Sequence, residues 1–83
     1  MKKNGIIVYV SYGGDEFLPS IVGVFKNTSE AFKAWRDECA FYERTGWELY
    51  DTMALDDPYT RSYAYYKEGR YNTHIVMQSC TIN

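Results

Sequence analysis

One segment in the middle of the 83-residue chain, residues 27–46, has the periodicity of an amphipathic helix and limits what the rest can form. Asn27 can cap this helix, with Glu30 at capping-box spacing and Thr28 as a competing cap. Gly46 is placed to end it. An apolar stripe recurs at helical spacing between charged residues and consists of Phe32, Trp35, Cys39 and Tyr42. Strand-like segments flank the helix on both sides, so the chain predicts an α+β fold.

Three strands are expected outside the tyrosine-rich region of the chain. Residues 6–12 are β-branched and aromatic with two apolar faces, which indicates a central strand or one covered by a partner subunit. A turn at residues 13–16 separates this strand from a second one at residues 20–25. Residues 47–55 alternate as a third strand, whose mainly apolar face is interrupted by Asp51. The apolar members of that face are Trp47, Leu49, Met53 and Leu55.

Five of the nine tyrosines lie within residues 59–71, where a hairpin is expected. A two-residue turn at Glu68-Gly69 and a four-residue loop at residues 67–70 give the same register, which pairs Tyr66 with Tyr71. A three-residue loop would flip one strand relative to the other, so the expected faces depend on this turn.

In that register the two hairpin strands have one core face and one open face. The predicted core face consists of Ala64, Tyr66, Tyr71, Thr73, Ile75 and Met77. The predicted open face is polar, aromatic and cationic, and consists of Arg61, Tyr63, Tyr65, Asn72, His74 and Gln78. Tyr66→Ala is therefore expected to cost about 3–5 kcal/mol of stability, and Tyr65→Ala to leave the fold intact.

Residues 1–83 are expected to form a single small domain of order β-β-α-β-β, with one helix packed on one face of a mostly antiparallel sheet. The expected core includes Phe32, Trp35, Cys39, Ile75 and Met77. A chain this short, with two cysteines, is expected to gain stability as a homodimer or higher oligomer rather than from disulfides. The apolar run at residues 6–10 is too short for a signal sequence or a membrane span, so a cytoplasmic location and no membrane contact are expected.

The first half of the chain carries a recurring pattern. The first strand is followed by the segment Ile21-Val22-Gly23-Val24-Phe25, and the helix opens with Thr28-Ser29-Glu30-Ala31. This order of a strand, a "GVF" strand, an "eeA" helix and further strands resembles small uncharacterised domains of phage and bacterial genomes, over roughly residues 6–50. The resemblance implies a compact αβ domain of phage or mobile-element origin with no inherited catalytic residues, located in the host cytoplasm if phage-encoded.

Residue types that carry metal or nucleophilic chemistry are sparse. His74 and Cys80 share a strand face but lie about 20 Å apart, whereas zinc ligands lie about 2.0–2.3 Å from one ion. Nothing in the local sequence orients His74 toward a nucleophile, and Cys39 fits a small buried hydrophobe. We therefore expect no enzymatic activity, no metal and no cofactor. A net charge of −2 and a pI near 5.2 argue against duplex nucleic-acid binding.

The predicted open face of the hairpin is the remaining candidate site. Its tyrosines can stack on a base and its cations can bind phosphate, which suits a small anionic nucleotide-like ligand. The candidate ligand-binding residues are Arg61, Tyr63, Tyr65, Lys67, Arg70, Asn72 and His74. The hypothesis that follows is a non-enzymatic, phage-type anti-defence factor that sequesters a nucleotide-derived signal. Docking on a host protein through the same face is the alternative, and a merely solvated sheet surface would have the same composition.

Overall fold

A computed structural model describes residues 3–13, 19–54, 59–70 and 72–82 as five strands and one helix. The elements are β1 (Lys3–Tyr12), β2 (Ser20–Phe25), α1 (Thr28–Arg44), β3 (Glu48–Ala54), β4 (Arg61–Tyr66) and β5 (Thr73–Ile82). All strands pair antiparallel in one sheet of order β2-β1-β5-β4-β3, so β5 is the central strand. The predicted α+β class and the order β-β-α-β-β are confirmed. A fifth strand is present because residues 48–54 and the two arms of the hairpin each form a strand.

The helix begins and ends where its cap residues predict. The Asn27 side chain accepts a hydrogen bond from Ser29 N at 2.8 Å, which satisfies one of the free N–H groups of the first turn. At the other end Thr45 is the C-cap, and Gly46 follows at φ +90, a conformation that favours glycine. Both local signals therefore set the length of α1.

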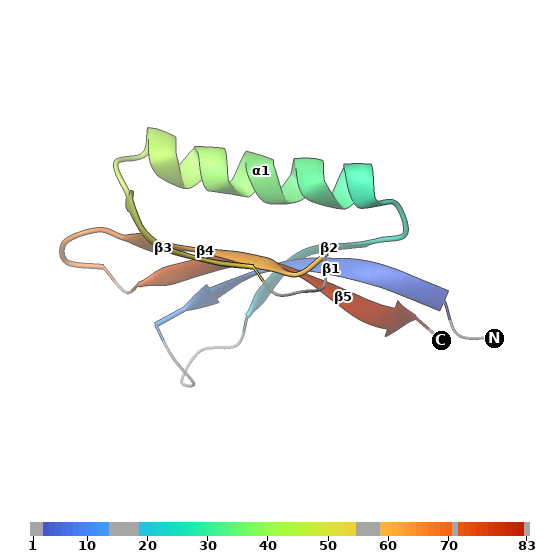
Figure 1. Ribbon diagram of the computed structural model, residues 1–83. Helices are drawn as coiled ribbons and strands as arrows, with labels where there is room; N and C mark the ends of the chain where they lie inside the picture. Colours follow the sequence, from blue (N-terminus) through green and yellow to red (C-terminus); the bar gives the residue numbers. More distant parts are fainter. Residues whose placement is uncertain (1–2, 14–18, 55–58, 71, 83) are drawn as a thin grey trace.

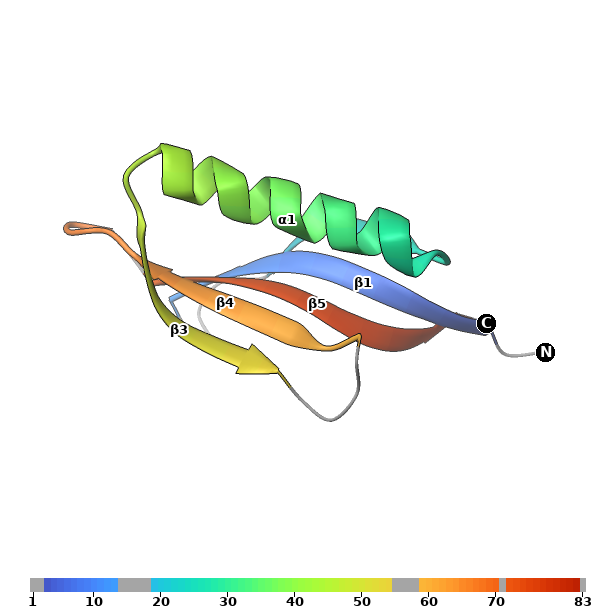
Figure 2. The ribbon, with the colours of Figure 1, turned by 45° about the horizontal axis from the view of Figure 1, so that its top comes forward.

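One face of the sheet lies beneath α1, as Figures 1 and 2 show, and the core is between them. Trp35 is fully buried, and its Nε1 donates to Ile75 O at 2.9 Å. The predicted core residues Trp35, Cys39, Ile75 and Met77 are confirmed as buried. Phe32 is not, being 38% exposed, because the helix seam that faces the sheet runs through Ala31, Trp35, Cys39 and Tyr42.

The predicted apolar face of β3 is wrong. The pairing of β3 with β4 shifts between Leu49 and Asp51, which leaves an extra residue in β3. Leu49 lies opposite Tyr65 and Met53 opposite Ser62, so these two apolar residues are on different faces of the sheet. Every residue of β3 is exposed, because this strand forms the outer edge of the sheet. Leu55 lies outside the described residues.

The predicted register of the hairpin is also wrong. Tyr65 pairs with Thr73, so an odd number of residues, 66–72, lies between the last paired residues of the two strands. The predicted register requires an even number there. The turn contains a bond from Arg70 N to Lys67 O at 3.0 Å, with Gly69 at φ +77 in the position that a type II turn reserves for glycine. The shift by one residue exchanges the two faces of β4 and leaves those of β5 as predicted.

The exchange of the two faces of β4 is clearest at the adjacent residues Tyr65 and Tyr66. Tyr65 was expected on the open face and is completely buried under α1, whereas Tyr66 was expected in the core and is 46% exposed. Tyr71, which was also expected in the core, lies outside the described residues, as do residues 14–16 of the expected turn.

The two sides of the sheet have different surroundings. The covered face is the side beneath α1, and the open face is the opposite side, on which no described helix or strand lies (Figure 1). No helix among the described residues is long and apolar enough to cross a membrane.

Candidate functional site

The seven predicted ligand-binding residues do not come together in the structure. Arg61, Tyr63 and Tyr65 have their side chains on the covered face, because they pair with Met77, Ile75 and Thr73. His74 points to the open face, opposite Ser11 and Ala64. Lys67, Arg70 and Asn72 lie around the hairpin turn. The aromatic and cationic surface expected from the sequence is therefore divided between two faces and a turn.

The tyrosines of that expected surface pack in or against the core: Tyr65 is completely buried, and Tyr63 is half-buried. Tyr63 packs edge-on against Trp35 with ring centroids 4.6 Å apart, and Tyr65 stacks on Tyr42 at 6.0 Å. The Tyr65 hydroxyl donates to Glu43 Oε2 at 2.8 Å. Burial and this hydrogen bond raise the pKa of Tyr65 above its usual value. Neither ring is free to stack on a ligand.

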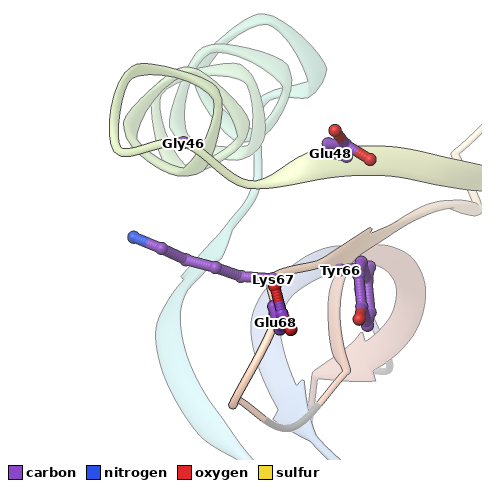
Figure 3. A pocket seen from close by; sticks show the side chains of 5 residues that line it. All are labelled: Gly46, Glu48, Tyr66, Lys67 and Glu68. Atoms are coloured by element: carbon purple, nitrogen blue, oxygen red, sulfur yellow. The ribbon is translucent and has the colours of Figure 1, made fainter.

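Two of the three cations of that expected surface, Arg61 and Lys67, are also used by the fold. The Arg61 guanidinium lies over the Phe32 ring, 5.5 Å from its centroid, which shields the exposed flank of that aromatic residue. Lys67 extends to the C-terminal end of α1, where its Nζ donates to Thr45 O at 2.7 Å (Figure 3). A cation is favourable there because the helix C-terminus presents free carbonyl groups.

A pocket of about 330 Å³ lies beside this lysine, between the end of α1 and the hairpin (Figure 3). It is lined by Gly46, Glu48, Tyr66, Lys67 and Glu68. Two carboxylates line it, and its single lysine already binds the helix terminus. The pocket therefore has the wrong charge for an anionic nucleotide-like ligand.

The open face carries a different feature, a row of uncharged side chains that crosses all five strands. Strand pairing places one residue of each strand side by side: Ile21 of β2, Tyr9 of β1, Val76 of β5, Ser62 of β4 and Met53 of β3. The outer members are widely exposed, Ile21 at 62% and Met53 at 52%. We call these five residues the open-face row.

Further apolar and polar side chains flank the open-face row. Ile7 and Val24 pair on one side of it, and Ser11, His74 and Ala64 on the other. Carboxylates occur on this face only at the β3 margin among the described residues, where Asp51 and Glu48 pair with Ala64 and Tyr66. A strand with one solvated face normally places polar residues on it. Here the open-face row carries no charged side chain, and beside it the Tyr9 hydroxyl donates a hydrogen bond to Gln78 Oε1 at 3.2 Å.

The described residues hold little reactive chemistry. They contain no group of three or more His, Cys, Asp or Glu side chains that could bind a metal ion. Burial raises the pKa of the Cys39 thiol to about 11, so this thiol is protonated near neutral pH. Cys80 is a free, half-buried thiol on the open face. These groups do not form a nucleophile with a neighbouring base.

Comparison of the chain with protein-family models, with curated proteins and with solved structures finds no significant match. The resemblance to small phage and bacterial domains therefore stays a prediction, and the candidate site rests on the geometry of this chain.

Sequence reasoning did not find the open-face row as a unit. The two apolar faces of residues 6–12 predicted a central strand or one covered by a partner subunit, and β1 is an interior strand between β2 and β5. Cover of its second face by a partner stays a prediction. Ser62 and Met53 were missed because their faces depend on the hairpin register and on the bulge in β3, which local sequence does not specify.

Proposed function

We propose that this chain is a protein-binding module that docks on another polypeptide through its open sheet face. The observation that carries the proposal is the open-face row, an uncharged surface that reaches from one edge of the sheet to the other. Apolar surface left exposed on a folded domain marks an interaction site when it is contiguous and bordered by polar groups. Glu48 and Asp51 form such a border at β3.

The shape and charge of the face favour a protein over a small ligand. Ligand sites are concave and enclose most of the ligand, whereas docking surfaces are broad and flat. Nucleotide sequestration, the first hypothesis from the sequence, needs cations and aromatic rings on one surface. Protein docking, the alternative hypothesis, needs neither cations nor stacking rings. The docking surface that we propose is the whole open face rather than the tyrosine-rich hairpin. A role in anti-defence stays a prediction.

A photo-cross-linking amino acid at position 76 tests the proposal in cells that produce the chain. Val76 lies on the central strand, in the middle of the open-face row, so a docked polypeptide must lie within reach of this position. The matched control carries the same cross-linker at Phe41, an exposed apolar residue of α1. A discrete protein product from position 76 and none from position 41 is expected. No product at 76, or the same products from both positions, would contradict the proposal.

A further inference from the structure

We infer that the polypeptide bound by the open face is a second copy of this chain, so that two sheets stack into a sandwich with an α1 helix on each outer side. The inference rests on the proposed function and names its partner. Stacked sheets lie about 10 Å apart, and each covers the apolar side chains of the other. In such a symmetric contact both copies contribute the same surface.

The order of the strands determines how two open faces can match. A two-fold axis that runs along β5, between the sheets, places β1 over β4 of the second copy and β2 over its β3. Within the open-face row, Tyr9 then lies over Ser62, and Ile21 over Met53. A two-fold axis perpendicular to the strands would instead place each of these residues over the same residue of the second copy.

Side-chain size favours the first arrangement. Ser62 and Ala64 have small side chains and are only 7% and 3% exposed, so β4 presents no large side chain at these two positions of the open face. The large ring of Tyr9, on β1, lies over these small side chains when β1 of one copy lies over β4 of the other. Large side chains opposed to small ones let two layers interdigitate, whereas a ring opposed to a ring leaves voids beside it.

Charge is compatible with self-association at the same place. The open-face row has no charged side chain, so two copies bring no like charges together at its centre. Asp51, at the β3 margin, lies over the β2 margin of the second copy on the Ser11 side of its Ile21, so it does not face another Asp51. The two Asp51 carboxylates are therefore on opposite sides of the contact.

The area of the face limits the size of the contact. Five strands about 4.8 Å apart and about six residues long, at about 3.3 Å per residue, give a face of roughly 24 by 20 Å. Two such faces bury roughly 1,000 Å² in total, at the lower limit for a specific interface. An area at this limit is typical of a weak, reversible contact rather than of a permanent dimer.

The sheet edges are poorer places for a second copy. The pairing of β2 with β1 shifts at Val8 and Tyr9, and that of β3 with β4 shifts at Leu49 and Asp51, so each edge strand contains a bulge. Bulges twist an edge strand and interrupt the regular backbone ladder that another strand would need. The open face has no such obstacle.

Light scattering from micromolar to several hundred micromolar concentration tests the inference. The wild-type mass should rise from 9.7 kDa toward twice that value. Val76→Arg should stay at 9.7 kDa throughout, because the contact would bury an unpaired guanidinium at its centre. Phe41→Arg, a matched change of an exposed apolar residue on α1, should assemble like the wild type. Circular dichroism establishes that each variant is folded.

Ile21→Arg is the second variant, because Ile21 is so exposed that its replacement cannot disturb the core. It should weaken dimerisation at least tenfold. A wild type that stays at 9.7 kDa, or a folded Ile21→Arg that dimerises as tightly as the wild type, would overturn the inference. Dimerisation that survives both arginine variants would point to an edge contact and would overturn it as well.

The axis is tested by cross-linking two variants, each with one introduced, exposed cysteine, with a short bifunctional maleimide. In a Cys80→Ser background, Ile21→Cys mixed with Met53→Cys should give the mixed product in excess over either self-product. Cys39 does not interfere, since it is buried. Self-products in excess would exclude the axis along β5. A monomeric wild type whose cross-linker at position 76 still captures a different polypeptide would overturn the second-copy inference and retain the proposed function.

Discussion

The two faces of this sheet are built from the same strands but differ in what their side chains do. On the covered face, Val8, Tyr65 and Ile75 are completely buried, and the polar groups among them are paired. On the open face, Tyr9 and Val76 come from the same strands, yet no described element of the chain covers them. Folding of one copy explains the first set. The second set has no role in the core of a single copy, which is why we attribute it to binding.

The largest difference between the faces is expected at the adjacent residues Tyr65 and Tyr66. Tyr65→Ala should lower the free energy of unfolding by about 3–5 kcal/mol, because it removes a buried aromatic ring. Tyr66→Ala should change it by less than about 0.5 kcal/mol, since that ring is exposed. Urea unfolding of both variants measures the contrast. A silent Tyr65→Ala together with a strongly destabilising Tyr66→Ala would show that the register of β4 is wrong.

Alkaline pH should weaken the covered face selectively. Burial raises the pKa of Cys39 from 9.0 to about 11, so the folded chain holds this proton more tightly than the unfolded chain. The stabilisation is complete below pH 9 and should be lost as pH rises to about 11, by roughly 2–3 kcal/mol. Tyr42 and Tyr65, whose pKa values burial also raises, act in the same direction above pH 10.

Urea unfolding as a function of pH measures this loss. Cys39→Ala should have a smaller decline between pH 9 and 11 than the wild type, whatever its stability at neutral pH. Cys80→Ala, which alters a thiol on the open face, should leave the decline unchanged and serves as the control. An equal decline in wild type and Cys39→Ala would contradict the assignment.

A smaller effect is expected at the start of α1. Asn27→Ala removes the side-chain acceptor of the bond from Ser29 N and should cost about 1 kcal/mol of stability. The dimerisation constant should not change, because α1 lies on the opposite side of the sheet from the proposed contact. Urea unfolding and light scattering on the same sample separate the two quantities. A variant that loses dimerisation along with stability would argue against independent faces.

The accuracy of prediction from the sequence differs between the elements of this molecule. The ends of α1 follow from Asn27 and Gly46, whose effects act within one turn of the helix. The faces of β5 follow from alternation, with Ile75 and Met77 buried as expected. Residues 20–25 form a strand as expected. Elements specified by neighbouring residues are therefore predicted correctly.

The faces of β3 and β4 could not be predicted in this way. In β4 both alternating sets contain tyrosines, so Tyr65 and Tyr66 are equally suited to the core by residue type. Only the number of residues in the turn decides between them, and the Glu68-Gly69 pair is compatible with more than one loop length. In β3 the bulge has no local signal in the sequence. The candidate site shared these errors because it was built on the hairpin register.

The two faces each carry a described methionine, and oxidation of these two residues tests the account most directly. Met77 is 1% exposed on the covered face, and Met53 is 52% exposed on the open face. Brief peroxide treatment at low and at high chain concentration, read by mass spectrometry, should leave Met77 reduced in both samples. Met53 should oxidise rapidly in the dilute sample and much more slowly in the concentrated one, where Ile21 of a second copy covers it. Oxidation of Met53 at the same rate in both samples would contradict self-association through the open face.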